Sequence, residues 1–587
     1  MSIFTTSKKN FVKLELKGIY RDIGNQVLSR SDLSPHKYFR FDYFYEQVER
    51  IVTSESVKRV IIQRWSSFSV PVFGALEEIR TAIQRLRKAG KEVYYYAPEY
   101  NTSDCFLASA CNFRVLHPLG TVSFLGRSIS SVFFRKLFEK HGIETTVIRR
   151  ERYKGAADSF RTEKYDEYAR KQYQELLDGL IGSMRKVISD SSGTGKKEGF
   201  SKEKLDEMLA GRIYMASEAL ETGLVDELNT IDDLTNQWNS QKFKGRQVKI
   251  RSRYGKGPHV AILVFEGMIV EGNNARHPVF GQAIGDRPMI RLIRKVRKNR
   301  FIKAVIFRIN SQGGSAVASE NILRELDALN RVKPVIISMG PVAGSGGYWI
   351  SGTGRRLFAL PTTLTGSIGV LALFFNISGF LNKYGLTTDS IKHGDSADLG
   401  SAYRSLTDRE KKMIDENIGF LYGKFLDHVA KARKLSREKV HDLGQGRLWL
   451  GNDAAGHGLV DQAGGLYDAM AYVKEILGKK SVRFLFLPRQ PFFVRLMTRQ
   501  GAATDSGHTS HIFTSLMRNL SLKFSGLTWQ ENNVENEPIE GMPGIFTSAV
   551  PLALVPFLKA CLSVHGEPLL MDPVMIDLMT GSENPAF

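Results

Sequence analysis

The segment GRIYMASEALETGLVDE (residues 211–227) recurs 235 positions later as GRLWLGNDAAGHGLVDQ (residues 446–462), and this recurrence decides the fold. Two pairs earlier in the chain, Pro118 with Pro361 and Gly142 with Gly385, lie 243 positions apart. The smaller offset of the later pair predicts a net insertion in the first copy, within SDSSGTGKKEG (residues 189–199). Units of this length are duplicated domains rather than solenoid repeats.

Within each copy, short β-branched runs alternate with amphipathic segments. RVIIQ (59–63) and AVIFRI (304–309) are typical of buried strands, and the apolar residues of segment 76–86 recur at helical spacing before Gly90. This alternation predicts an α/β fold with parallel sheets covered by helices. We expect a first repeat at 11–240, a basic linker at 241–257, a second repeat at 258–480 and a C-terminal extension at 481–587.

Composition is that of a globular protein, because 42% of the 587 residues are hydrophobic and 24% are charged. The net charge of +21 is concentrated in KFKGRQVKIRSRYGKG (242–257) and IRLIRKVRKNR (290–300). Neither cluster belongs to a recognisable nucleic-acid module, so we do not expect nucleic acid as a partner. An anionic membrane surface is a more natural partner, and an ordinary solvated face is the alternative.

Targeting and redox signals are weak. The N-terminal MSIFTTSKKNFVKLELKG has neither a secretory core nor a membrane anchor, so we expect a cytoplasmic protein, peripheral to the inner membrane if it meets one. The apolar stretch 545–564 is interrupted by two prolines and a lysine, and we expect the extension to be membrane-binding, self-occluding or partly disordered. Cys105, Cys111 and Cys561 have no metal-site spacing and read as free thiols.

A candidate nucleophile follows the apolar run VIISMGPVAG. Ser345 lies there between glycines, before a helix expected near Tyr348, and such a strand-to-helix turn aims backbone amides at an anion formed on the hydroxyl. The preceding strand ends in the glycine turn of RINSQGGSAVASE (308–320). Because the two turns follow consecutive strands, the amides of Gly314 and Gly346 are candidates for an oxyanion hole.

Two residue types could act as the base for this serine. His393 is the nearest downstream histidine and lies near two aspartates, but its spacing marks no catalytic triad. A lysine can serve if burial disfavours its ammonium form. Lys154 lies among small residues in RRERYKGAADSF, after the strand-like TTVIRR (145–150).

Taken together, these motifs resemble the two-repeat form of signal peptide peptidase A, in peptidase family S49, over roughly residues 11–480. AGSGGYWIS around Ser345, RYKGAADSF around Lys154 and LTGSIG (364–369) match the family's motifs, and NSQGG (310–314) differs from its turn only by Gln312 in place of proline. The resemblance implies tandem Clp-protease/crotonase-like domains, and a Ser345 nucleophile with Lys154 as base and Ser367 orienting the lysine. It further implies peptide substrates such as remnant signal peptides, a homo-oligomer (a tetramer is favoured), no metal and no cofactor. Family members of this form usually carry an N-terminal anchor, which we do not expect in this chain.

The repeat offset supports the resemblance independently. At an offset of 243, Ser345 falls on Thr102 and Lys154 falls on Ala397, so each copy retains only one member of the pair. Complementary loss predicts a single composite site formed by both repeats. Two alternatives remain: an acyl-CoA hydratase or thioesterase of the same fold, and a catalytically silent membrane scaffold.

Overall fold

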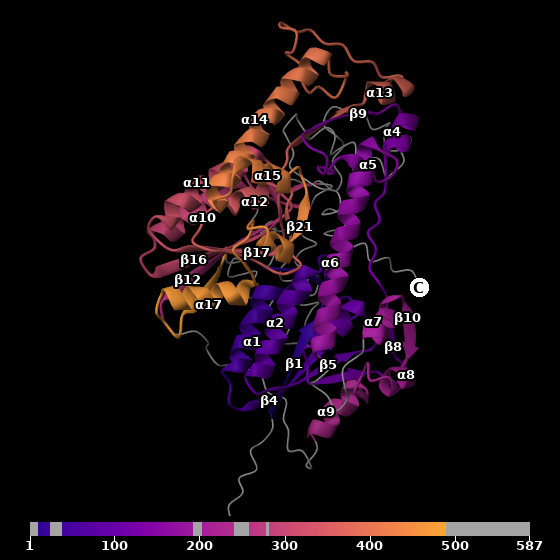
Figure 1. Cartoon of the computed structure of the whole chain (residues 1–587), viewed down its shortest axis with the longest axis vertical. Coiled ribbons are helices and arrows are strands. Elements are labelled where there is room, and N and C mark those ends of the chain that lie inside the picture. The colour runs from indigo at the N-terminus through magenta and orange to yellow at the C-terminus, as the bar shows by residue number, and fades with distance from the viewer. Residues whose placement is uncertain (1–9, 24–37, 192–201, 240–256, 278–280, 489–587) are drawn as a thin grey trace, which may run out of the picture.

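The computed structural model describes residues 10–23, 38–191, 202–239, 257–277 and 281–488, and two parallel sheets dominate it (Figure 1). All neighbouring strands of the first sheet are parallel. In spatial order they are β1 (Asn10–Leu16), β4 (Val57–Arg64), β5 (Glu92–Ala97), β7 (Phe113–Leu116) and β11 (Glu227–Leu228).

The second sheet repeats this order and extends it at both ends. Its core strands are β12 (His259–Glu266), β16 (Ile302–Ser311), β17 (Val335–Gly344), β18 (Leu357–Ala359) and β22 (Gln462–Ala463). Two short strands continue it past the end of β17: β19 (Leu364–Gly366) and β21 (Leu448–Leu450). At the other side β23 (Arg483–Leu487) pairs with β12, so the start of the segment expected to be an extension belongs to this sheet.

Four smaller sheets complete the strands. A pairing between the two halves joins β9 (Glu144–Arg149) to β20 (Leu371–Asn376). The others are β10 (Arg212–Met215) with β8 (Thr121–Phe124) and β6 (Tyr100–Asn101); β13 (Met268–Val270) with β15 (Gly281–Gly285) and β14 (Ala275–His277); and β2 (Ile19–Arg21) with β3 (Tyr38–Arg40).

Helices alternate with the strands in both halves. In the first half they are α1 (Phe41–Val52), α2 (Gly74–Lys88), α3 (Thr102–Ala108), α4 (Arg135–His141), α5 (Asp158–Arg161), α6 (Glu167–Ser191), α7 (Lys202–Leu209), α8 (Ala216–Glu221) and α9 (Ile231–Asn239). In the second half they are α10 (Asp286–Lys298), α11 (Ala316–Asn330), α12 (Gly346–Ile350), α13 (Ser378–Lys383), α14 (Asp408–Arg433), α15 (Arg437–Leu443), α16 (Gly451–Gly456) and α17 (Leu466–Ile476).

Helix α2 shows how local sequence sets these elements. Leu76, Ile79, Ile83 and Leu86 are all buried on one face, as their spacing predicts. The helix ends at Lys88, and Gly90 follows with a φ of 74°, the left-handed conformation that glycine adopts readily after a helix.

The two halves share one continuous core. Helices α1, α2 and α17 lie between the two sheets (Figure 1), and the largest apolar cluster joins residues of α1 and α2 to strands β12 and β16. The approach is close, since a Cβ added at Gly74 on α2 would lie 3.1 Å from Cα of Pro341 on β17. The relative placement of the repeats is therefore fixed by packing, which matters for any site that both supply.

Buried charges also cross this interface. Arg308 on β16 is fully buried and contacts Glu78 on α2 at 2.7 Å and Asp22 after β2 at 3.3 Å. Nearby, Glu266 at the end of β12 accepts a hydrogen bond from the Asp22 backbone N–H at 3.1 Å. Burial raises the pKa of Glu266 to about 7, and the charge of Asp22 contributes, while Arg21 opposes the shift.

Several sequence expectations concern other parts of the chain. Cys105 and Cys111 are free thiols, whereas Cys561, the apolar stretch 545–564 and most of the expected insertion lie outside the described residues. Among the helices that are described, none combines the length and the apolar character needed to cross a membrane.

Candidate active site

Ser345 occupies a sharp turn between β17 and α12. Its φ of 53° and ψ of −117° are unusual for a residue with a side chain, and they place it as the N-cap of α12. Its N–H donates to the carbonyl of Gly366 (2.9 Å), and its carbonyl accepts from the Trp349 N–H (2.8 Å). The helix begins at Gly346, two residues earlier than expected, because the turn closes directly after the serine.

Lys154 reaches this turn from the other half. Strand β9 pairs with β20, and the chain beyond it runs along residues 445–446, where the Tyr153 N–H donates to the carbonyl of Gln445 (3.0 Å). Gly446 has a φ of 78°, and a Cβ there would lie 2.6 Å from the Lys154 nitrogen of the backbone. Only glycine therefore lets the two segments approach this closely.

The structure brings the two side chains into contact. Nζ of Lys154 lies 3.0 Å from Oγ of Ser345 and 2.9 Å from Oγ of Ser367, and it also donates to the carbonyl of Ser367 at 3.2 Å. All three residues are fully buried. Complete burial of an amine disfavours its charged form, so a lysine here is suited to accept a proton from a neighbouring hydroxyl.

Ser367 is positioned by the turn after β19. Its φ is 50°, and its N–H donates to the carbonyl of Arg447 at 2.7 Å. Gly369 lies against the lysine stem, because a Cβ there would be 3.2 Å from Cδ of Lys154. The turn after β19 in the second repeat therefore contacts both the amine and the carbon stem of Lys154.

The two glycine turns are adjacent, as expected from their strands. Gly314 has a φ of 149°, and a side chain there would collide with the carbonyl of Ile269 on β13. A Cβ added at Gly346 would lie 3.3 Å from the backbone nitrogen of Gly314. The backbone of Gly314 therefore lies close to Gly346, the residue that follows Ser345.

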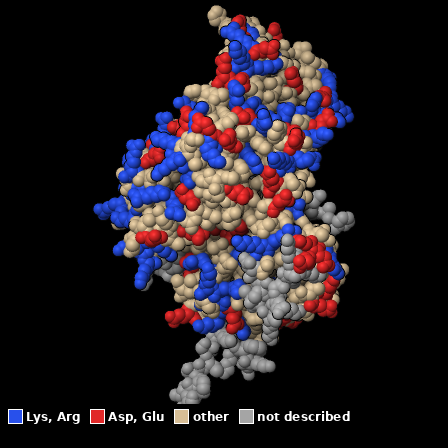
Figure 2. Space-filling model, viewed as in Figure 1, with Lys and Arg blue, Asp and Glu red and all other residues tan. Residues whose placement is uncertain are grey.

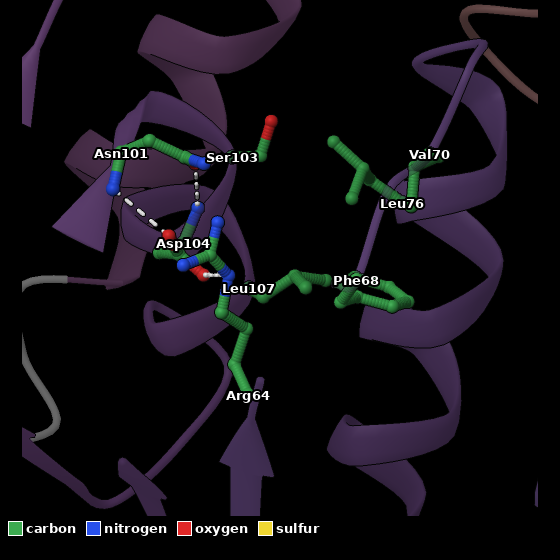
Figure 3. Close-up of a pocket in the computed structure, with 8 residues that line it drawn as sticks. All are labelled: Arg64, Phe68, Val70, Leu76, Asn101, Ser103, Asp104 and Leu107. Carbon is green, nitrogen blue, oxygen red and sulfur yellow. Dashed lines mark hydrogen bonds and ion pairs between the residues drawn. The ribbon is translucent and has the colours of Figure 1, made fainter. Parts of the chain in front are cut away.

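The same place in the first repeat has different chemistry. Tyr100 and Asn101 pair with Val122 and Ser123 as Ala343 and Gly344 pair with Thr365 and Gly366, so Thr102 is the counterpart of Ser345, as the 243-residue offset gives. The N-cap of α3 is the preceding residue, Asn101. Asn101 and Asp104 form a reciprocal capping box, and Arg64 pairs with Asp104 at 3.5 Å beside a small pocket (Figure 3). Backbone N–H groups at the start of α3 therefore donate to side chains of the helix itself.

His393 does not join the site. It is exposed after α13, and within the described residues no hydrogen bond links it to Ser345. The same residues contain no group of three or more His, Cys, Asp or Glu side chains placed to hold a metal ion.

Sequence reasoning missed several residues that build the site. Gln445 and Gly446 hold the backbone beside Lys154, and Arg149 and Asp158 contact the loop that carries it. The one available signal was that Gly446 opens the repeated segment GRLWLGNDAAGHGLVDQ. Contacts between segments about 290 residues apart leave no local pattern.

Known proteins are similar to this chain over most of its length. The model of peptidase family S49 matches residues 85–243 and 327–480, more than half of the chain. Protease 4 of Haemophilus influenzae is 29% identical over 464 residues, which cover 76% of this chain and 74% of that protein. The chloroplastic serine protease SPPA of Arabidopsis thaliana is 31% identical over 422 residues, 69% of this chain and 61% of that protein. Protease 4 of Salmonella typhi is 29% identical over 431 residues, covering 71% and 69%. The chain therefore belongs to peptidase family S49 and is a serine peptidase.

Proposed function

We propose that the protein is an endopeptidase with a Ser345/Lys154 dyad built on two crotonase-like repeats, cutting short apolar or unfolded peptides such as remnant signal peptides. The observation that carries the proposal is the 3.0 Å contact between Lys154 Nζ and Ser345 Oγ, made by residues of opposite repeats in a fully buried setting. The matching strand order of the two large sheets supports the duplicated fold.

The proposed reaction is acyl transfer. Ser345 Oγ attacks the scissile carbonyl while neutral Lys154 takes the hydroxyl proton, and the amides of Gly314 and Gly346 stabilise the oxyanion. Lys154 then returns the proton to the leaving amine, and the acyl-enzyme is hydrolysed by water activated by the same lysine. Ser367 accepts a hydrogen bond from the amine and holds it toward Ser345.

Hydrolysis of an internally quenched apolar peptide tests this proposal. Ser345→Ala should abolish cleavage, and Lys154→Arg should do the same because a guanidinium does not release its proton at usable pH. In the wild type the rate should rise with pH, with a midpoint below the roughly 10.4 of an exposed lysine. Unchanged turnover by either variant would refute the dyad.

We also propose a homo-oligomer in which copies contact head to tail, as the two repeats do within one chain. Helix α6 covers Leu364, Leu448 and Leu450 of the second repeat. The counterparts of the last two, Ile213 and Met215, are 55% and 61% exposed. Helix α14, the counterpart of α6, exposes 63% of Phe420. A second copy would cover both surfaces, and a heterologous contact of this kind forms a ring when the rotation between copies closes.

The strands support the same contact. Residues 128–133 are the counterpart of β20, and residues 387–392 are the counterpart of β9, yet neither segment forms a strand in the described chain. We expect them to pair between copies. Light scattering should show an assembly that Phe420→Glu and Met215→Glu dissociate, whereas Val332→Glu, at another exposed apolar position, leaves it intact. A monomeric wild type would contradict the proposal.

A peripheral contact with anionic membrane is the third part of the proposal. Basic side chains gather at the left of Figure 2, over α10 and the loop after it. Six exposed cations in this region form no ion pair with a described carboxylate: Arg287, Arg291, Lys295, Lys298, Arg300 and Lys303. The apolar ring of Phe301, 60% exposed, lies among them. Such a surface suits a negatively charged leaflet.

Co-sedimentation with phosphatidylserine vesicles tests this contact. Replacing Lys295, Lys298 and Arg300 by serine should weaken binding, and binding by the wild type should fall with added salt. A chain truncated after Pro488, which retains β23, measures how much the remaining residues of the extension contribute to vesicle binding. If only the truncated chain loses binding, the extension rather than the α10 surface carries it.

A further inference from the structure

Lys154 lies in an irregular loop, so its position depends on contacts rather than on regular secondary structure. Strand β9 ends at Arg149 and α5 begins at Asp158, and the residues between them form neither helix nor strand. The Gln445–Gly446 segment holds the amino side of Lys154. The carbonyl side needs a second support.

Arg149 supplies this support from the last position of β9. Its Nη1 donates to the Lys154 carbonyl at 3.1 Å and to Oδ1 of Asp158 at 3.2 Å. One nitrogen can make both bonds at once because Nη1 of a guanidinium carries two N–H donors. The arginine therefore spans the two ends of the lysine loop.

The partners of Arg149 are themselves anchored. Asp158 is nearly buried and also pairs with Arg161 at 2.8 Å, and Asp166 lies 3.6 Å from both guanidinium groups. Burial raises the pKa of Asp158, while the charges of Arg149 and Arg161 oppose that shift. The two arginines and the two aspartates have a net charge of zero. The four side chains can therefore stay ionised although they are largely shielded from solvent.

Arg150, the next residue, provides an internal comparison. Its side chain points to the opposite side and pairs with Asp415 on α14 at 2.6 Å. Like Arg149 it ties the region after β9 to a neighbouring element, but no hydrogen bond that we observe joins it to Lys154. A comparison of variants at the two arginines therefore distinguishes two effects. Loss of Arg150 removes a contact of the region after β9, whereas loss of Arg149 also removes the contact with Lys154.

We propose that Arg149 is a positioning residue that holds the Lys154 carbonyl, and through it keeps Nζ within hydrogen-bond reach of Ser345. The proposal rests on the proposed Ser345/Lys154 dyad. Without Arg149, the backbone of Lys154 would no longer be held in one position. The Nζ amine would then spend less time beside Ser345 and would become more hydrated. The pH at which the lysine is half protonated would then rise toward that of an exposed lysine.

Modification of Ser345 by a fluorophosphonate, measured in the full chain as a function of pH, tests the proposal. Arg149→Gln and Arg149→Lys should lower the limiting rate at least about tenfold, and should move the midpoint of the pH profile upward. Arg150→Gln should leave both quantities within about twofold. Thermal unfolding shows whether each variant folds. If Arg149→Gln does not fold, Arg149→Lys can be tested in its place, because lysine keeps a positive charge beside Asp158.

Lys154→Met in the same assay separates the possible failures. If it labels like the wild type, the dyad is wrong and the role of Arg149 falls with it. If Lys154→Met is silent while both Arg149 variants retain the wild-type rate and profile, only the positioning role is refuted. The role is also refuted if Arg150→Gln reproduces the slow rate and the shifted profile of Arg149→Gln.

Discussion

Single residues with unusual backbone angles define the site. Ser345 and Ser367 both have positive φ, and Gly314 and Gly446 stand where a Cβ would strike a neighbouring backbone. Such conformations persist only where the surrounding structure enforces them, and they concentrate at functional sites. The serines and Gly314 were accessible from motifs in the sequence, whereas the role of Gly446 depends on a contact with Lys154 that no local pattern records.

Gly446→Ala should therefore inactivate the enzyme. Gly385 is a matched control, because its φ of 74° resembles the 78° of Gly446 but nothing lies within 4 Å of its added Cβ. Both alanines should cost about 1 kcal/mol from the backbone conformation alone. Only Gly446→Ala should displace Lys154, so peptide hydrolysis should fall more than tenfold in that variant. Equal activity of the two variants would show that the contact does not matter.

At the scale of elements, the equivalent helices α3 and α12 differ in how their N-termini are capped. Asn101 caps α3 through a bond from the Asp104 N–H at 3.0 Å, whereas Ser345 makes no side-chain cap bond to α12. The sequence predicted that each copy had kept part of the site, and it predicted the alternation of strands and helices. It did not predict the capping box, which begins at Asn101, one residue before the position that aligns with Ser345.

Alanine at these two N-caps should have opposite effects. Asn101→Ala should lower the free energy of unfolding by about 1 kcal/mol and leave hydrolysis intact. Ser345→Ala should abolish hydrolysis, and any change in its free energy of unfolding should come from the lost contact with Lys154, because no cap bond is lost. Denaturant unfolding and peptide cleavage of the same preparations measure both quantities. Loss of activity in Asn101→Ala with native stability would assign chemistry to the first repeat.

For the whole molecule, the buried charges at the interface link stability to pH. Glu266 has its pKa raised from 4.5 to about 7, so the folded chain retains a proton that the unfolded chain has released at intermediate pH. The stabilising contribution of that proton is complete below about pH 4.5 and is lost as the pH rises through about 7. Neither this cluster of charged side chains nor its burial was predictable, since its members come from the end of β2 and from α2, β12 and β16.

Glu266→Gln should consequently flatten the pH dependence. Between pH 5 and 8 the melting temperature of the wild type should decline more than that of the variant, because glutamine stays neutral throughout. Glu475→Gln, at an exposed position of α17, controls for the loss of one negative charge. Parallel declines in all three proteins would mean that Glu266 does not hold a proton in the folded state.

The central claim is that one site is formed by Ser345 and Lys154 from different repeats, and mapping a serine-directed fluorophosphonate by mass spectrometry tests it most directly. We predict one label per chain, on Ser345 alone, and no label on a folded Lys154→Met variant, because without the lysine nothing removes the hydroxyl proton. A label on any other serine, or full labelling of Ser345 in Lys154→Met, would contradict the composite site.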